Sequence, residues 1–269
     1  MVEPMALVLY HSPFSTCSQK VRLCLAEKDL RFTTREVNLA TQEHLAPDYL
    51  TINPNGVVPT LLDSGIPIVE SSVICEYLDE IVPSPPLSPP DAAGRAQMRA
   101  WMRFLEEVPT AAIRVPSFNR VFGDALSEMS EDAFAALTER MPLRRNFYNE
   151  MGLQGFTDAR VHESIGCLRQ TLERADAAAA GDRWLCGAQF TIADILLIPT
   201  VVRMEDLGLE ALWADLPAIA DWYARAQART SFAAAFYEGT RLSAAFGWTF
   251  GEAAGNAPVA TGKLAFERQ

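Results

Sequence analysis

Four small residues with hydroxyl or thiol side chains, Ser15-Thr16-Cys17-Ser18, stand between an apolar run at 6–10 and an amphipathic run at 16–27. This order predicts a strand, a short loop and a helix. The four side chains then fall where the first backbone N–H groups of a helix lack intrahelical partners. A thiol attacks as its thiolate, and a hydroxyl donor beside a helix N-terminus stabilises that anion. Ser15 is therefore either a thiolate-stabilising donor or a simple N-cap.

Cys17 is a second candidate for the same chemistry, as a thiol of the protein itself. Residues two apart on a helix point roughly 200° apart, so Ser15 and Cys17 do not face one sulfur equally. If Ser15 is the residue that stabilises the thiolate, we expect Cys17 to be a packing or secondary residue.

The elements that position these residues alternate in type over the first eighty positions. The patterns predict a β-α-β-α-β-β-α order, and the tight Asp63-Ser64-Gly65 turn joins the last two strands as a hairpin. Expected strands lie at 6–10, 31–37, 59–63 and 66–70, and expected helices at 16–27, 42–51 and 71–81. Five prolines within residues 82–91 predict a stiff linker and a domain boundary.

Nearly everything after the linker has helical periodicity, with Thr191-Ile-Ala-Asp194 as a variant capping box. The expected helices lie at 95–114, 158–180, 191–207, 216–227 and 232–237. A tail beyond residue 242 is rich in Gly and Ala and carries Phe246, Trp248 and Phe250.

Composition narrows the classes of function. The 269 residues are 49% hydrophobic and carry a formal net charge of −11, which suits a packed core and argues against a nucleic-acid partner. We expect no membrane span, because no 18-residue apolar run occurs, and no signal peptide. Five cysteines without metal-like spacing predict reduced thiols, no metal site and a cytoplasmic protein.

Four motifs together resemble the soluble glutathione transferases of the serine type, in particular the theta and zeta classes. They are SPFSTCSQKVR, INPNGVVPTL, IVESSVICEYLDE and FTIADI, at 12–22, 52–61, 68–80 and 190–195. The resemblance implies a thioredoxin-like, glutathione-binding domain at 5–82, an all-helical acceptor-substrate domain at 92–242, and a tail at 243–269 that covers part of the active site. It also implies glutathione as co-substrate and a homodimer.

The same resemblance implies the residues of the glutathione site. Ser15 would activate the thiol, Val58 before a cis Pro59 would pair with the cysteinyl backbone, and Glu70 with Ser71 would bind the γ-glutamyl end. His44 would bind the glycine carboxylate. The chain departs from the family pattern at Val57, where Lys or Gln is frequent, so side-chain help for this carboxylate is lost there.

Within the superfamily the chain most resembles the bacterial glutathione-dependent β-aryl-etherases, on its opening motif, on ESSVICEYLDE and on a long middle of the helical domain, which spans 131–156. These enzymes imply an apolar, aromatic acceptor pocket. The candidates are Phe14, Trp101, Phe104, Phe118, Phe147, Tyr148 and, in the tail, Phe246, Trp248 and Phe250. Arg114, Arg144 or Arg145 could meet a phenolate or a carboxylate, or lie on a solvated helix face.

Three hypotheses therefore stay open. In the first, glutathione thiolate attacks a carbon that bears an aryloxy group α to a ketone, and a phenol and a thioether result. In the second, a glutathione lyase or reductive dehalogenase uses Cys17 for thiol exchange. In the third, the fold is kept as a non-catalytic binding module.

Overall fold

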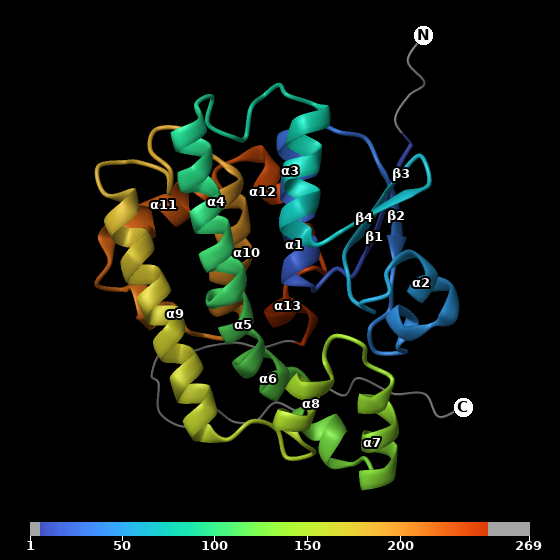
Figure 1. Ribbon diagram of the computed structural model, residues 1–269. Helices are drawn as coiled ribbons and strands as arrows, with labels where there is room; N and C mark the ends of the chain where they lie inside the picture. Colours follow the sequence, from blue (N-terminus) through green and yellow to red (C-terminus); the bar gives the residue numbers. More distant parts are fainter. Residues whose placement is uncertain (1–5, 247–269) are drawn as a thin grey trace.

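The computed structural model of the chain describes residues 6–246. Its first part is a four-stranded sheet with helices on both faces (Figure 1). In chain order the elements are β1 (Leu7–His11), α1 (Thr16–Glu27), β2 (Thr33–Glu36), a 3₁₀ turn (Glu43–Leu45), α2 (Pro47–Ile52), β3 (Thr60–Asp63), β4 (Ile66–Val69) and α3 (Ser71–Ile81). The strand order is β2-β1-β3-β4, with β1 parallel to β2 and antiparallel to β3. The predicted thioredoxin-like arrangement is confirmed.

Local sequence explains two details of this domain. Ser64 and Gly65 both have positive φ, at 51° and 87°, as a tight turn between antiparallel strands requires. The single helix expected at 42–51 is instead a 3₁₀ turn followed by α2. Pro47 causes the break, because proline can begin a helix but disfavours helical backbone in the residue before it.

The proline-rich linker is anchored on the first domain. Lys28 Nζ contacts the Asp79 carboxylate and donates to the carbonyl oxygens of Val82 (2.7 Å) and Pro85 (2.5 Å). Asp79 Oδ1 in turn accepts the backbone N–H of Leu87 at 2.9 Å. One buried ion pair therefore fixes the course of the linker over the end of α3.

The second part is helical, as predicted. It contains α4 (Ala92–Glu107), α5 (Pro109–Ala112), α6 (Arg114–Ser127), α7 (Glu131–Glu139), α8 (Arg145–Met151), α9 (Asp158–Ala179), α10 (Ile192–Asp206), a 3₁₀ turn (Glu210–Trp213), α11 (Pro217–Gln227), α12 (Thr230–Ala235) and α13 (Leu242–Ala245). The helix expected at 95–114 is interrupted after residue 107, because Pro109 has no N–H for the ladder. No helix within residues 6–246 is both long and apolar enough to cross a membrane.

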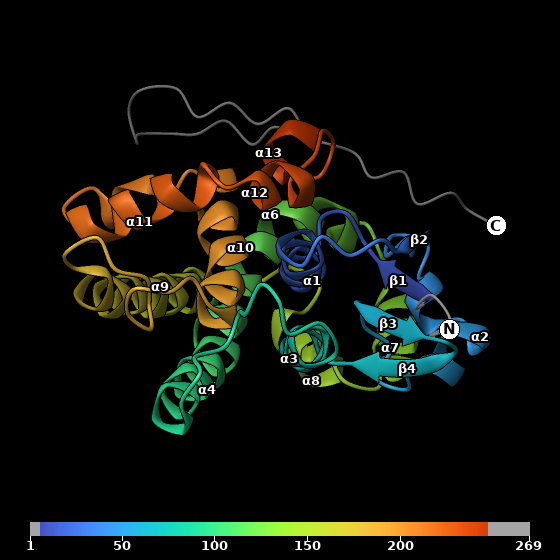
Figure 2. The same cartoon turned by 90° about the horizontal axis from the view of Figure 1, so that it is seen from above.

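One large core joins the two parts. Its buried apolar side chains come from β1, α1 and α3 as well as from α4, α9, α10 and α11, and α10 lies next to α1 (Figure 2). Asp194 starts α10 with a complete capping box and also accepts from Leu185 N and Trp222 Nε1. A second, smaller cluster, which includes Phe118, Phe147 and Tyr148, packs α6, α8 and the chain before α9. The segment of α6, α7 and α8 lies at one end of the molecule (Figure 1).

Candidate active site

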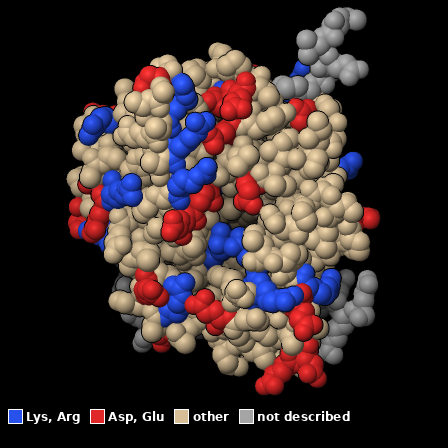
Figure 3. Space-filling view, in the orientation of Figure 1, with Lys and Arg blue, Asp and Glu red and all other residues tan. Residues whose placement is uncertain are grey.

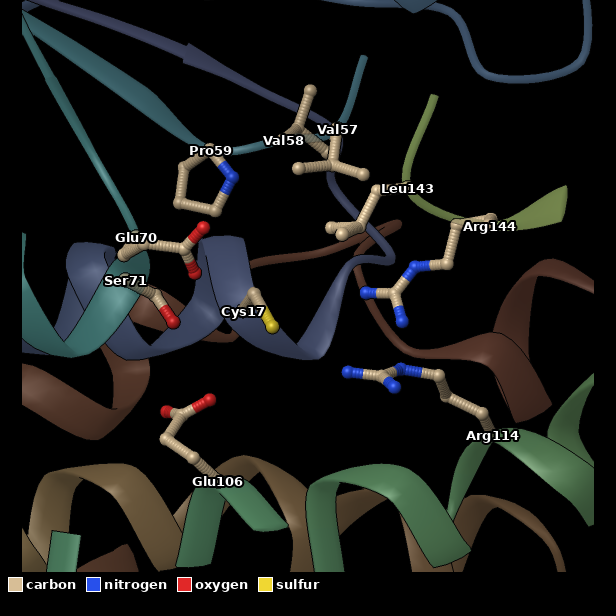
Figure 4. A pocket seen from close by; sticks show the side chains of 10 residues that line it. All are labelled: Cys17, Val57, Val58, Pro59, Glu70, Ser71, Glu106, Arg114, Leu143 and Arg144. Carbon is tan, nitrogen blue, oxygen red and sulfur yellow. The ribbon is translucent and has the colours of Figure 1, made fainter. Parts of the chain in front are cut away.

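A pocket opens at the N-terminus of α1, between the sheet domain and the helical domain. Figure 4 shows the side chains that line it. They are Cys17, Val57, Val58, Pro59, Glu70, Ser71, Glu106, Arg114, Leu143 and Arg144. The first six belong to the sheet domain and the other four to α4, α6 and the α7–α8 loop. Of the predicted glutathione-site residues, the pocket brings together Val58, Pro59, Glu70 and Ser71.

Two side-chain hydrogen bonds fix the backbone of the loop before β3. The carbonyl oxygen of Val57 accepts from Tyr49 Oη at 2.6 Å and from Asn53 Nδ2 at 2.8 Å. The Val58–Pro59 peptide bond is cis, as the resemblance implied. The backbone of Val58 is thus presented at the pocket by fixed polar contacts.

Glu70 is held in an uncommon backbone conformation, with φ of 69° and ψ of 115°, directly before α3. Side chains other than glycine rarely adopt positive φ, and such residues cluster at functional sites. Asn55 Nδ2 donates to Glu70 Oε1 at 3.3 Å, which aims the carboxylate. Asn55 is a positioning residue that the sequence motifs did not single out. Ser71 follows as the first residue of α3, where free backbone N–H groups favour an anion.

Ser15 and Cys17 have different surroundings. Ser15 Oγ accepts the backbone N–H of Ser18 at 3.2 Å and so caps α1, while its own hydroxyl hydrogen remains available for donation. Cys17 lies in the first turn of α1 and its sulfur points into the pocket (Figure 4). Ser15 is not among the residues that line the pocket, whereas Cys17 is.

Two buried arginines support the loop that leads to Ser15. Arg22 Nη2 donates to the carbonyl oxygen of Pro13 at 2.9 Å and Arg22 Nε to that of Ala235 at 3.0 Å. Arg203 from α10 donates to the carbonyl oxygen of Phe14. The start of α1 is therefore fixed from both domains, since Ala235 and Arg203 belong to the helical one.

Glu106 is an acid of the pocket that sequence reasoning missed. Its Oε1 accepts from Lys20 Nζ at 2.9 Å, and Lys20, fully buried, also donates to Thr110 Oγ1 at 3.1 Å. Lys20 and Glu106 lie on α1 and α4, so their partnership depends on the tertiary fold. The sequence carried no signal for this pair, because its two members lie 86 positions apart and the burial of Lys20 is seen only in the structure.

The opposite wall is basic. Arg114 begins α6 and Arg144 stands just before α8, and their guanidinium groups face each other close to Cys17 (Figure 4). Burial first, and the charge of Arg114 second, lower the pKa of Arg144 to about 10. Figure 3 shows a hollow in this face of the molecule with acidic side chains on one side and basic ones on the other. Arg145 is exposed outside the pocket and donates to the carbonyl oxygen of Glu139 at 2.6 Å.

His44 lies outside the lining of the pocket and is close enough to Arg140, at the end of α7, to feel its charge. Burial, followed by the charge of Arg140, lowers the pKa of His44 to about 4, so the ring is neutral near pH 7. Its buried Nδ1 has no partner among the described residues. The α7–α8 loop contacts the sheet domain, since Arg140 Nη1 donates to Gln42 Oε1 at 3.1 Å.

Among residues 6–246, none of the predicted aromatic acceptor residues lines this pocket, and five of them form two groups. Trp101 and Phe104 pack edge-to-face in the main core, with the guanidinium of Arg174 over both rings. Phe118, Phe147 and Tyr148 contact one another in the second cluster. Phe14 is half-buried at the loop that Arg203 holds, and Phe246 follows α13. Trp248, Phe250 and the cover predicted for the tail lie outside the described residues.

Comparison with known proteins agrees with this architecture. The family model for the glutathione S-transferase N-terminal domain matches residues 14–81, and that for the C-terminal domain matches residues 158–225. Together the two models match about half of the 269 residues. The chain belongs to the glutathione S-transferase family, and the sequence expectation of a glutathione transferase is confirmed at that level.

Individual relatives cover most of the chain. A glutathione S-transferase of Arabidopsis thaliana, TCHQD, is 27% identical over 83% of this chain and 87% of its own. A tetrachloro-p-hydroquinone reductive dehalogenase of Sphingobium chlorophenolicum is 25% identical over 83% and 93%. The β-etherase LigF of Sphingobium sp. strain SYK-6 has the same fold, with a TM-score of 0.77 and 24% identity over 86% of this chain and 99% of its own. Other solved structures with this fold hold bound glutathione.

Proposed function

We propose that the pocket binds glutathione with its thiol at the N-terminus of α1 and its γ-glutamyl end at Glu70 and Ser71. The carboxylate of Glu70 would meet the γ-glutamyl ammonium, and the first N–H groups of α3 with the Ser71 hydroxyl would meet its carboxylate. The backbone of Val58 would pair with the cysteinyl unit as an added strand does. Family membership and the relatives with bound glutathione support glutathione as the ligand.

Bound this way, the glutathione sulfur would lie near Ser15 and Cys17 and face Arg114 and Arg144. The hydroxyl of Ser15 can donate to a thiolate, and the positive end of α1 favours the anion. The reaction proposed is displacement of an aryloxide from a carbon α to a ketone. The new bond joins sulfur to carbon, the carbon–oxygen bond breaks, and its electron pair leaves on the phenolate.

The observation that carries this proposal is the basic wall opposite the thiol end, where a departing oxyanion would find positive charge. The name of the structural relative LigF, a β-etherase, is consistent with it. The acceptor would be a hydrophobic aromatic molecule with one group that is an anion or becomes one when it leaves.

A turnover screen with glutathione, read by mass spectrometry, tests the proposal. Neutral β-aryloxy ketones should release a phenol and give a glutathione thioether, with no mixed disulfide on the protein. Failure to bind glutathione at all would instead support a non-catalytic module.

The position of Cys17 favours a second candidate, thiol exchange. The Cys17 thiolate would attack the sulfur of a glutathione thioether, forming a Cys17–glutathione disulfide while the released carbanion takes a proton. A second glutathione would then reduce that disulfide and leave as glutathione disulfide, so two thiols are oxidised and the organic substrate is reduced. The relationship to a reductive dehalogenase supports this chemistry, and the Cys17 sulfur lines the pocket.

Two variants separate the candidates. If displacement is the reaction, Ser15→Ala should lower turnover roughly ten- to a hundredfold, the effect of losing a hydrogen bond to a charged group, and Cys17→Ser should be nearly neutral. Thiol exchange predicts the reverse for Cys17→Ser, together with a mixed disulfide that mass spectrometry detects in the wild-type protein.

We also propose a homodimer, which the family resemblance implied. The apolar face of α4, with Met98, Met102 and Leu105, is buried within the chain and is not free to form an interface. Exposed apolar side chains occur instead on the neighbouring β4 and α3, where Ile66 is 68% and Val73 is 45% exposed. Sedimentation of wild type and Val73→Glu at micromolar concentration tests this, and a monomeric wild type would contradict it.

A further inference from the structure

Arg114 and Arg144 stand out among the cations of the described chain because they face each other without an anion between them. They come from separate segments, the first residue of α6 and the residue before α8, and both are half-buried beside Cys17 (Figure 4). Within residues 6–246 neither side chain has a hydrogen bond or an ion pair. Other arginines in this region are matched: Arg229 pairs with Glu27 at 2.6 Å, and Arg22 donates to three carbonyl groups.

The acids of the pocket are already engaged. Glu106 accepts from Lys20, and Glu70 accepts from Asn55, so neither lies within ion-pair distance of the two guanidinium groups. The two like charges repel each other, and after burial the charge of Arg114 is the second cause of the lowered pKa of Arg144. An anion between the two groups would remove that repulsion and offer each guanidinium a partner. Paired guanidinium donors match the geometry of a carboxylate or another oxyanion.

We propose that Arg114 and Arg144 form an anion subsite beside Cys17 that binds an oxyanion of the acceptor substrate. This inference rests on the proposed function, because it places the acceptor next to the glutathione thiol. The oxyanion is either a carboxylate that the acceptor carries or the aryloxide that it releases. In the second case, the electron pair of the broken carbon–oxygen bond is held between the two guanidinium groups until water protonates the oxygen.

The position of the subsite distinguishes it from the ends of glutathione. Glu70 and Ser71 lie on the other side of Cys17 from Arg114 and Arg144 (Figure 4). Arg144 is carried by the loop that also holds Leu143 over the pocket, so the length of this loop brings the charge to the site. The acceptor wall thereby favours an aromatic molecule that carries or releases an oxyanion.

Binding measurements test the subsite without requiring turnover. Calorimetry would compare glutathione, the conjugate S-(4-carboxy-2-nitrophenyl)glutathione and the methyl ester of that conjugate. Wild type should bind the acid more tightly than the ester. Arg114→Gln and Arg144→Gln should weaken the acid about 10- to 100-fold, the usual cost of losing a charge-assisted hydrogen bond, and should leave the ester and glutathione within about threefold. Arg145→Gln is the matched control and should match wild type.

Turnover of neutral β-aryloxy ketones distinguishes the two sources of the oxyanion. If the subsite receives the aryloxide, both variants should lower kcat, and the loss should grow as the leaving phenol becomes less acidic. If the subsite instead binds a carboxylate that the acceptor carries, both variants should keep the kcat of wild type for neutral ketones. They should still bind the acid conjugate more weakly than wild type does.

Three results would overturn the inference. In the first, wild type binds the acid and the ester with equal affinity, and both variants keep the kcat of wild type for neutral ketones. This result contradicts the anion subsite but not the glutathione site. Loss of glutathione affinity in the variants, absent when the glycine end is blocked as its ethyl ester, would assign the arginines to glutathione. A wild type that binds neither glutathione nor either conjugate defeats the proposed function itself, and the inference with it.

Discussion

Ser71 lies at the first turn of α3, on the far side of the pocket from Arg114 and Arg144. Because the γ-glutamyl end does not react, a contact made there has the same strength in the ground state and in the transition state. We predict that Ser71→Ala raises KM for glutathione roughly tenfold and leaves kcat nearly unchanged. Steady-state kinetics with varied glutathione measure this.

Ser72→Ala is the control for that measurement. Ser72 is the next residue of the same helix and is buried, but it does not line the pocket. The Ser72→Ala variant should have the same KM for glutathione as wild type. A fall in kcat at constant KM in Ser71→Ala would show that the reacting end of the ligand lies at α3.

Val58, Pro59, Glu70 and Ser71, which the pocket brings together, could be named from sequence because each belongs to a short motif with a local cause. Glu70 and Ser71 precede and start a helix, and Val58 precedes a proline. The sequence could not show which of Ser15 and Cys17 enters the pocket, because that depends on how α1 is rotated against α10. Glu106 was missed for the same reason, and Arg144 was named only as one of three candidate arginines, because the tertiary fold decides which of them reaches the pocket.

At the scale of elements, the Lys28–Asp79 pair joins α1, α3 and the linker. Both side chains are buried, and removal of one leaves the other charge without its partner. We predict that Lys28→Met lowers the free energy of unfolding by about 3–5 kcal/mol, measured by urea denaturation. Arg99→Met is the control, because Arg99 pairs with Glu76 between α4 and α3 but is half exposed, and exposed pairs contribute about 0–1 kcal/mol. Similar losses in the two variants would contradict this role.

The helix limits predicted from the sequence are correct where a residue next to the helix caps it. The predicted limits of α1 and α3 agree with the structure, and the limits of α9 and α10 agree to within a residue at each end. The error at 95–114 arose because apolar periodicity continued past the point where Pro109 breaks the hydrogen-bond ladder. The α6–α8 segment was recognised as an insert, but its fold was not, since its short helices pack mainly on one another.

At the scale of the whole molecule, His11 links stability to pH. Its side chain is 2% exposed and its Nδ1 lies 3.1 Å from Arg22 Nη1, which requires a neutral ring that accepts. Burial, and then the charge of Arg22, lower the pKa of His11 from 6.5 to about 4. Between these values the unfolded chain binds more protons than the folded one, so stability is lost as the pH falls from about 6.5 toward 4.

We predict that His11→Asn flattens this dependence, by at most about 3 kcal/mol across the window. Urea denaturation of wild type and variant between about pH 7.5 and pH 4 measures it, and the difference between the curves removes the contribution of the carboxylates. His162→Asn, at an exposed site on α9, is the control and should leave the curve of wild type unchanged. Parallel curves for wild type and His11→Asn would contradict the assignment.

The contact between the insert and the sheet domain could not be predicted from sequence. It depends on close approach at Gly56, which has a φ of 58° and where an added Cβ would lie 3.0 Å from Leu45 Cδ2 and 3.2 Å from Pro142 Cδ. The NPNG motif indicated a turn at this glycine. It did not indicate that a loop 86 residues later would cover it.

The packing of α1 has a consequence for synthesis of the chain on the ribosome. This helix is among the first elements to emerge, yet it packs against α10 and α12. Arg22 can donate to the carbonyl oxygen of Ala235 only after that residue has been made. Domains generally fold as units in the order in which they are made, but here the part of the first helix that packs against α12 has no cover until residue 235 has left the exit tunnel. Nascent chains that stall before α12 should therefore expose this part of α1 and bind chaperones that recognise apolar helices.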